Sequence, residues 1–159
     1  YGCERSPGST GAFRLFAYST PALSELWVVG GGSSSLTHME NLFYYREMDG
    51  IYARHISSGR VAWKANACSL NEHCASVFAS KSGRVFVAIN KQKRGGLVAL
   101  DSKSGGEIWR TNFKHLLEGS VGEDEHNLYC QESFDKSKDL PRLYIVRKST
   151  GRIVGCCRQ

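Results

Sequence analysis

Short runs in which apolar and polar residues alternate recur along the chain. One run, Leu97–Asp101, is followed by a Ser-Gly turn and by a second apolar run at Ile108-Trp109. Alternation with a period of two predicts a strand with one buried face, and Gly supplies the positive φ that a tight turn requires. The stretch therefore predicts a β-hairpin. A helix would need apolar residues three and four apart, and the Gly105-Gly106 pair would weaken it.

The same hairpin pattern occurs three times at a fixed interval. Its turn glycines, Gly59, Gly105 and Gly151, are 46 residues apart in both steps. A repeat of this length lies in the range of four-stranded propeller blades, so we expect an all-β propeller fold. Trp63 and Trp109 stand where one blade would pack on the next. The residues that define the repeat are Gly59, Trp63, Asp101, Gly105, Trp109 and Gly151.

The central copy, extended backwards, resembles a known family. Ser76–Ala88 followed by Leu97–Trp109 is similar to the PQQ-like, quinoprotein dehydrogenase-type β-propeller repeat, whose final hairpin carries Asp, Thr-Gly and Trp. The third copy has Arg147 at the Asp position and Gly155 at the Trp position, and the first copy has His55 at the Asp position. The resemblance covers roughly residues 40–157. It implies the fold more than the activity, because the two are separable.

The repeat also divides the chain. We expect an N-terminal arm without a strand of its own at residues 1–11, which are rich in Pro, Gly and Ser, and propeller blades over 12–157. A half blade is expected at 12–29, where Leu23 replaces the turn glycine, and three blades at about 36–65, 75–112 and 119–157. Rings of the resembled family usually carry about six to eight blades. Three to four four-stranded blades therefore predict a propeller that is incomplete or completed by another chain, since open blade faces invite association.

Six cysteines in a chain of 159 residues that begins at Tyr1 suggest a processed protein from an oxidising compartment, either secreted or in an organelle or periplasmic lumen. The sequence leaves three alternatives for Cys68 and Cys74, which lie on either side of His73: a disulfide, two free thiols, or half of a zinc site. Neighbours in a strand point to opposite faces, so we expect Cys156 and Cys157 to have different partners, one of them Cys3 or another chain. The candidate disulfide cysteines are Cys3, Cys68, Cys74, Cys130, Cys156 and Cys157.

The charge of the chain permits contact with acidic surfaces, because the net charge is +6 and the pI is about 9.1. The basic residues are scattered, however, and the two clusters fall in an exposed loop expected at residues 90–96 and at Arg147-Lys148. A nucleic-acid surface would interleave aromatic and basic residues on one face, so we expect no nucleic-acid partner. No run of about 18 apolar residues predicts a membrane span.

No catalytic motif accompanies the repeat in the sequence. There is no nucleophile elbow and no His-x-x-x-His spacing, and the acidic segment Glu123–His126 lacks the ligand spacing of a calcium loop. We therefore expect no catalytic, cofactor or metal site. The segment Glu132–Pro141 is longer than its counterpart in the preceding blade, and long loops often carry function. Its candidate partner-contacting residues are Phe134, Lys136 and Lys138.

These observations predict a non-catalytic interaction or scaffold module, completed by other protein subunits or by a second copy of the chain. The resemblance implies the same role, because outer-membrane assembly lipoproteins with this repeat act without catalytic residues. One alternative is a fragment of a PQQ-dependent quinoprotein oxidoreductase, whose cofactor lies with calcium on the axis of a complete ring under a vicinal disulfide. The other is a secreted carbohydrate-binding propeller, although Phe134 is the one aromatic residue in the loops at 90–96 and 132–141.

Overall fold

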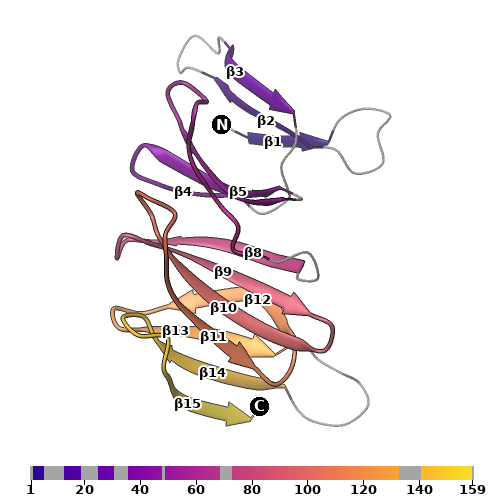
Figure 1. Ribbon diagram of the computed structural model, residues 1–159, viewed down its shortest axis with the longest axis vertical. Coiled ribbons are helices and arrows are strands. Elements are labelled where there is room, and N and C mark those ends of the chain that lie inside the picture. Colours follow the sequence, from indigo (N-terminus) through magenta and orange to yellow (C-terminus); the bar gives the residue numbers. More distant parts are fainter. Residues whose placement is uncertain are drawn as a thin grey trace. The chain divides into compact units, whose positions relative to one another are not determined.

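The strands that the structure describes form four sheets, in each of which consecutive strands are neighbours (Figure 1). The structure is a computed structural model, and it describes residues 2–5, 13–18, 25–30, 36–47, 49–68, 73–132 and 141–158. Within these ranges every regular element is a β-strand. Each sheet is a meander of antiparallel hairpins, so it forms from contacts between neighbouring segments of the sequence.

The four sheets are named in chain order. Sheet I consists of β1 (Gly2–Arg5), β2 (Phe13–Tyr18) and β3 (Glu25–Gly30). Sheet II consists of β4 (Leu36–Met39), β5 (Leu42–Glu47), β6 (Gly50–His55) and β7 (Val61–Ala65). Sheet III consists of β8 (His73–Ser80), β9 (Arg84–Lys91), β10 (Arg94–Asp101) and β11 (Glu107–Phe113). Sheet IV consists of β12 (Leu117–Glu123), β13 (Asn127–Glu132), β14 (Arg142–Arg147) and β15 (Ile153–Arg158).

Two expectations from the sequence are wrong. Residues 1–11 were expected to hold no strand, but Gly2–Arg5 forms β1 and pairs with β2, because backbone groups along the edge of β2 are satisfied by a further strand. The half blade expected at 12–29 is thus part of a three-stranded sheet. The loop expected at 90–96 is a tight turn, since β9 runs to Lys91, β10 begins at Arg94, and Gln92 turns the chain with a φ of 52°.

The chain divides into two compact units. Unit 1 comprises residues 1–67, 77–85 and 101–106, and unit 2 comprises residues 68–76, 86–100 and 107–159. Unit 1 contains sheets I and II and part of sheet III, while unit 2 contains the rest of sheet III and sheet IV. In unit 1, Trp27 packs against a cluster built on Phe43 and Tyr45.

The middle strands of sheets II and III are buried on both faces. Consecutive residues Phe43, Tyr44 and Tyr45 of β5 are at most 1% exposed, and so are the four residues Leu97–Leu100 of β10. Such unbroken buried runs are typical of strands covered on both sides, whereas a sheet with one wet face alternates. The buried runs of β5 and β10 therefore have both faces of the strand covered by other residues.

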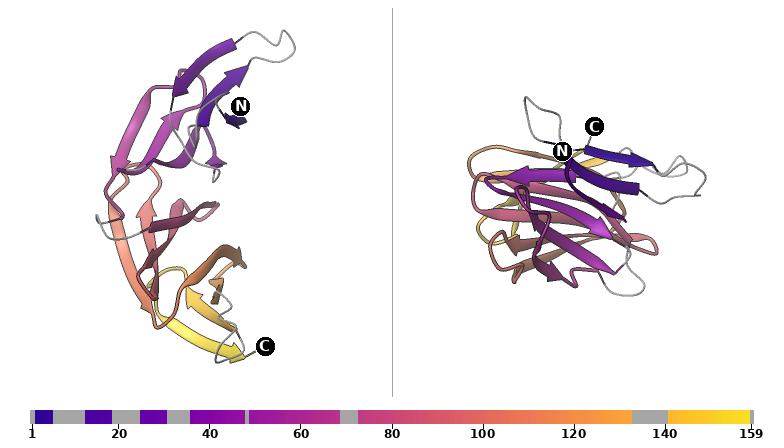
Figure 2. Two further views of the ribbon diagram at one scale, coloured as in Figure 1. Left: turned by 90° about the vertical axis from the view of Figure 1, so that its right-hand side faces the viewer. Right: turned by 90° about the horizontal axis from the view of Figure 1, so that it is seen from above.

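The last hairpin of every sheet has the same register (Figure 2 shows the hairpins from two further sides). In sheets I, II and III an alanine pairs with a tryptophan, and in sheet IV an isoleucine pairs with a glycine. A register shift follows each of these pairs directly. The pairs are Ala17 with Trp27, Ala53 with Trp63, Ala99 with Trp109, and Ile145 with Gly155. The 46-residue repeat of the sequence is thus a repeat of strand pairing as well.

Candidate functional site

The turns at Gly59, Gly105 and Gly151 share one geometry. Their φ angles are 66°, 73° and 72°, in the left-handed region that favours glycine. The N–H of each glycine donates to the carbonyl four residues earlier at 2.8 Å. In each turn the side-chain hydroxyl of the residue before the glycine accepts a hydrogen bond from the backbone N–H of the residue after the glycine. The distances are 3.4 Å from Arg60 N to Ser58 Oγ, 3.3 Å from Gly106 N to Ser104 Oγ and 3.3 Å from Arg152 N to Thr150 Oγ1.

Asp101 adds a carboxylate to the central turn. Its Oδ1 accepts from the N–H of Lys103 at 3.1 Å, from the N–H of Ser104 at 2.8 Å and from the Ser104 hydroxyl at 2.7 Å. The Ser104 hydroxyl is the main cause that lowers the pKa of Asp101 below its ordinary value, and the backbone donors add to it. The side chain thus closes its own turn.

Each of these turns accepts the indole of a tryptophan from the preceding sheet. Trp27 Nε1 donates to the Ile56 carbonyl at 2.8 Å, Trp63 Nε1 to the Ser102 carbonyl at 2.8 Å, and Trp109 Nε1 to the Lys148 carbonyl at 2.9 Å. In every case the acceptor stands three residues before the turn glycine. The first two contacts lie within unit 1 and the third within unit 2. A single chemical arrangement therefore joins each sheet to the next.

The indole rings leave no room for a side chain at the glycines. A Cβ built on Gly59 would lie 2.7 Å from the ring of Trp27, and one on Gly105 or Gly151 would lie 2.6 Å from Trp63 or Trp109. An aromatic residue packs on each indole as well, with ring centroids 5.2 Å apart for Trp27 and Phe43, 5.7 Å for Trp63 and Tyr44, and 5.7 Å for Trp109 and Phe86. Glycine is therefore required at these positions for two reasons: the turn has a positive φ, and the indole ring occupies the space that a side chain would take.

The structure brings the repeat residues together in pairs. Trp63 meets Gly105, Trp109 meets Gly151, and Gly59 meets Trp27, a residue that sequence reasoning placed in a hairpin but not in this contact. The carbonyl acceptors at Ile56, Ser102 and Lys148 were also missed. These three residues are also 46 positions apart, but any residue type can supply a backbone carbonyl, so no side chain marks the acceptor positions in the sequence.

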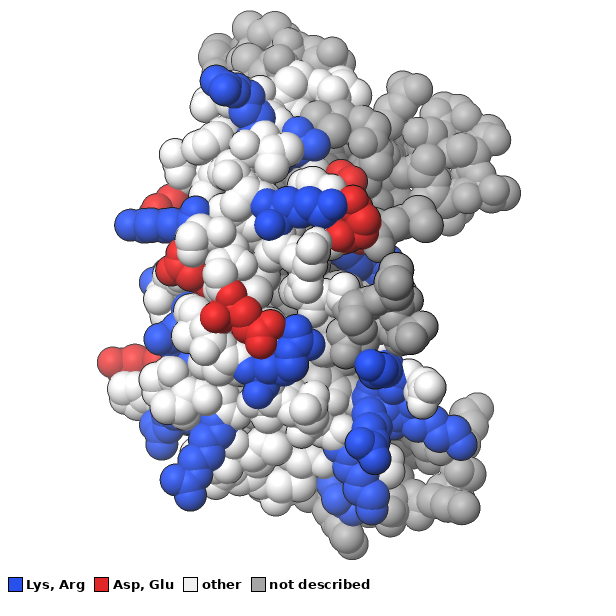
Figure 3. Space-filling model, viewed as in Figure 1, with Lys and Arg blue, Asp and Glu red and all other residues white. Residues whose placement is uncertain are grey.

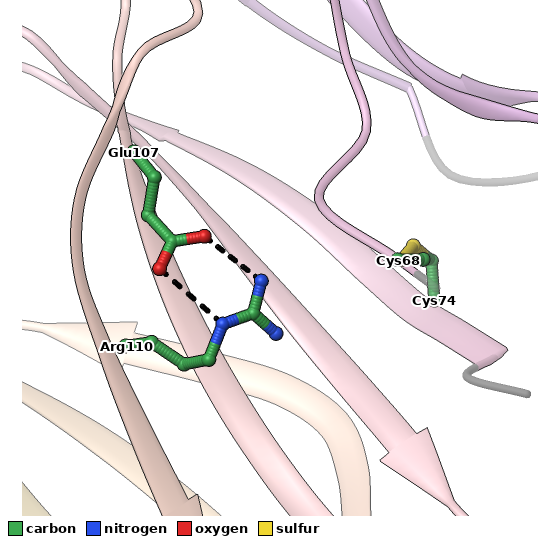
Figure 4. Close-up of a disulfide and its surroundings, with 4 residues drawn as sticks. All are labelled: Cys68, Cys74, Glu107 and Arg110. Carbon is green, nitrogen blue, oxygen red and sulfur yellow. Dashed lines mark hydrogen bonds and ion pairs between the residues drawn. A yellow bond between two sulfur atoms is a disulfide. The ribbon is translucent and has the colours of Figure 1, made fainter. Parts of the chain in front are cut away.

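The five cysteines whose side chains the structure describes fall into three environments. Cys68 and Cys74 are joined by a disulfide with a Cα–Cα distance of 6.3 Å (Figure 4), so of the three alternatives for this pair the structure contains the disulfide. Cys130 is free and buried, and burial raises the pKa of its thiol to about 12. Cys156 and Cys157 are free and exposed. Cys3 lies in β1, and its pairing stays a prediction.

The acidic segment between β12 and β13 forms a closed turn. Asp124 Oδ1 accepts from the N–H groups of His126 and Asn127 at 2.7 Å each, and Asp124 Oδ2 accepts from the Tyr129 hydroxyl at 2.6 Å. The Tyr129 hydroxyl is the first cause that lowers the pKa of Asp124, followed by the two backbone donors. Over the described part of the chain, no group of three His, Cys, Asp or Glu residues could hold a metal ion.

Basic and acidic side chains both occur on the face of the molecule shown in Figure 3. The exposed basic residues Lys93, Arg94 and Lys114 lie at one end of sheet III, because Gly95 pairs with Phe113. The candidate partner-contacting residues Phe134, Lys136 and Lys138 lie outside the described residues. In the ranges that the structure covers, no helix is long and apolar enough to cross a membrane.

Comparison with known protein families finds one whose model matches this chain. The PQQ-type family model described as outer membrane protein assembly factor BamB matches residues 47–154. No curated protein matches the chain significantly. Among solved structures, BamB from Moraxella catarrhalis is 20% identical with a TM-score of 0.64, and the match covers 93% of this chain and 47% of that one.

Two further structures share the fold. Quinohemoprotein alcohol dehydrogenase from Comamonas testosteroni is 14% identical with a TM-score of 0.71, covering 99% of this chain and 35% of that one. The computationally designed Ika8 protein is 9% identical with a TM-score of 0.57, covering 98% and 61%. The chain thus spans about half the length of the BamB structure that it matches, and its four sheets are a partial propeller. Together with the match over residues 47–154, the repeated sheets show that the chain belongs to the PQQ-like β-propeller family of BamB.

Proposed function

We propose that the chain is a non-catalytic interaction module: a set of propeller blades that forms part of a larger protein assembly, completed by other subunits or by a second copy. The observation that carries this proposal is the use of the repeat residues. Trp63, Trp109 and the glycines they meet are all engaged in joining sheets, and Asp101 closes its own turn. The residues that repeat most regularly therefore hold neighbouring sheets together, and partners would be held on the faces and loops of the sheets.

The family supports the same role. The matching family model is described as an outer membrane protein assembly factor, and the match covers most of the chain. A module with this role needs neither a cofactor nor nucleic acid, and contact with partners would include the loop that carries Phe134, Lys136 and Lys138. The Cys68–Cys74 disulfide supports a location in an oxidising compartment, either outside the cell or in an organelle or periplasmic lumen.

The experiment that tests this function measures the native particle and its chemistry together. The protein isolated from its source is expected to sediment as an assembly larger than the chain, without a quinone absorbance band. Addition of PQQ with calcium is expected to give no dye reduction with alcohols. A stoichiometric quinone that supports such dye reduction would overturn the proposal in favour of a quinoprotein oxidoreductase, and a glycan array that identifies a specific sugar would favour the carbohydrate-binding alternative.

A further inference from the structure

Basic side chains gather at one end of sheet III. The β9–β10 turn and the beginning of β10 supply two of them, and a third directly follows the last residue of β11. Figure 3, which has the view of Figure 1, shows Lys and Arg side chains gathered toward the lower right, on the side where Figure 1 draws the β9–β10 turn. We call these three exposed residues the basic end: Lys93, Arg94 and Lys114.

The carboxylates of sheet III lie at its other end. The strands of this sheet contain two acidic residues, Asp101 and Glu107, and both stand where β10 finishes and β11 starts. Both are also engaged there. Asp101 accepts hydrogen bonds within its own turn, and Glu107 Oε2 accepts from Arg110 Nη2 at 2.8 Å (Figure 4). Sheet III itself therefore supplies no counter-charge to the basic end.

The adjoining strands of sheet IV contribute little negative charge here. β12 begins at Leu117, three residues after the basic end, and Leu117 pairs with Glu132. The Glu132 side chain is buried, accepts from the Tyr144 hydroxyl at 2.6 Å and attracts the Arg142 guanidinium. Glu118 is exposed, but a single carboxylate does not balance three cations. The described surface around the basic end is therefore positive.

The backbone at the basic end is held in place. Asn90 Nδ2 donates to the Leu117 carbonyl at 3.0 Å, and the Leu117 N–H donates to Asn90 Oδ1 at 2.9 Å. Gly95 lets the same connection come close, because a Cβ built there would lie 2.6 Å from the His115 carbonyl oxygen. The backbone at Lys114 is thus fixed beside the β9–β10 turn without a partner, and a preorganised site loses less conformational entropy on binding.

Two of the three cations occupy facing positions. Gly95 pairs with Phe113, so the next residue outward is Arg94 on β10 and Lys114 after β11. Side chains at facing positions have Cβ atoms about 5 Å apart, and like charges there are destabilising. The fold thus brings two positive charges together, and an anion bound between them would relieve their repulsion.

The surroundings of the basic end favour a carboxylate-bearing protein segment over a lipid or a nucleic acid. Phe113 is 3% exposed, and the exposed neighbours Gln92 and Asn112 are polar. The described residues of this end therefore present no exposed aromatic ring to stack on a base or to enter a membrane interface. Adjacent strands are about 4.8 Å apart, so the ends of β9, β10 and β11 span about 10 Å, which is the length of about three residues of an extended chain.

We infer that the basic end of sheet III binds an extended acidic segment of a partner protein, whose carboxylates pair with Lys93, Arg94 and Lys114. This inference rests on the proposed function, since it names the chemistry of one partner of the module. The carboxylates supply the counter-charge that sheet III lacks at this end. Exposed ion pairs are individually weak and are screened by salt, so recognition depends on several pairs together and weakens as the salt concentration rises.

The test measures binding of a fluorescein-labelled octaglutamate peptide to the full chain by fluorescence anisotropy, with octaglutamine as the uncharged reference. Binding is expected for octaglutamate and not for octaglutamine, and the affinity for octaglutamate is expected to fall about tenfold or more in R94E/K114E. K81E/R147E is the matched control, because it reverses two exposed cations outside the basic end and changes the net charge equally. Its affinity is expected to stay within about threefold of the wild type, since distant charges are screened.

The single variant K114E gives a readout that a purely structural role of Lys114 would not produce. The substitution places a carboxylate opposite Arg94 in place of a like charge. The urea concentration at the unfolding midpoint is therefore expected to stay the same or rise, while the affinity for octaglutamate falls. A lower midpoint would show that Lys114 serves the folding of the chain, and it would overturn the inference.

The inference is also overturned if octaglutamate binds no better than octaglutamine, or if R94E/K114E binds it as tightly as the wild type does. Phosphatidylglycerol vesicles or single-stranded DNA that bind through Arg94 and Lys114 more tightly than octaglutamate would overturn it in favour of a lipid or nucleic-acid surface. If octaglutamate does not bind but the chain from its source still sediments as a larger assembly without a quinone, this inference is wrong and the proposed function stands.

Discussion

Gly105→Ala separates the two reasons for glycine in the docking turns. The residue has a φ of 73°, and a Cβ there would lie 2.6 Å from Trp63. The left-handed backbone costs alanine about 1 kcal/mol. Displacement of the indole adds about 2 kcal/mol of overpacking and about 1 kcal/mol for the lost hydrogen bond to Ser102. We expect the free energy of unfolding to fall by about 4 kcal/mol, the sum of these terms.

Gly83 provides the matched control. Its φ is 75°, but a Cβ built there meets nothing within 4 Å. Gly83→Ala should therefore show only the backbone cost of about 1 kcal/mol. In a Trp63→Ala background, Gly105→Ala should also cost only about 1 kcal/mol, because the ring is gone and the coupling between the two sites has been removed.

The assay is urea unfolding followed by circular dichroism, with the four chains of the Trp63 and Gly105 cycle and the Gly83 variant measured side by side. The reasoning is refuted if Gly105→Ala is no more destabilising than Gly83→Ala. It is also refuted if the cost of Gly105→Ala stays the same without Trp63, since the ring would then not be the cause.

Three other predictions follow from the charges and thiols. The pKa values of Asp101 and Asp124 are lowered in the folded chain, so the stabilisation from their ionised carboxylates is fully present above the ordinary pKa of 3.8 and is lost as the pH falls through the lowered values. The urea concentration at the unfolding midpoint should therefore fall in acid, and it should fall less for the Asp101→Asn variant than for the wild type. Because burial raises the pKa of Cys130 to about 12, iodoacetamide at mildly alkaline pH should modify Cys156 and Cys157 in the folded chain but not Cys130, as read by mass spectrometry; modification of Cys130 would contradict its burial. Cys74→Ser should lower the free energy of unfolding by about 2 kcal/mol, because the Cys68–Cys74 disulfide closes a short loop. If the urea midpoint of the wild type is the same under reducing and oxidising conditions, the disulfide makes no such contribution.

The repeat made much of the fold predictable. A turn glycine every 46 residues and the alternating strands around Leu97–Trp109 led to the propeller class, because glycine and alternation reflect local backbone geometry. The strand at Gly2–Arg5 could not be found in this way. Its residues carry no alternation, and they become a strand only because the edge of β2 offers hydrogen bonds.

The sheet-joining contacts were predictable only in part. Trp63 and Trp109 were recognisable as packing residues, yet nothing in their spacing says that the indole N–H would reach Ser102 and Lys148, whose side chains play no part in the contact. Likewise, Gly155 was recognisable as a missing tryptophan, but its relation to Ile145 depends on strand register. Sequence patterns identify residues by side chain, and contacts made by the backbone escape them.

The sequence distance spanned by each indole contact has a consequence for how the chain folds and comes apart. The donor and acceptor are 29, 39 and 39 residues apart, so each contact links a sheet only to its immediate successor. Chains built from such nearest-neighbour links behave as one-dimensional arrays, in which stability is a sum of modules and junctions. Breaking one junction should uncouple two neighbours without melting either. Unfolding of this chain should then begin at a sheet that has one such junction and spread from each sheet to its neighbour.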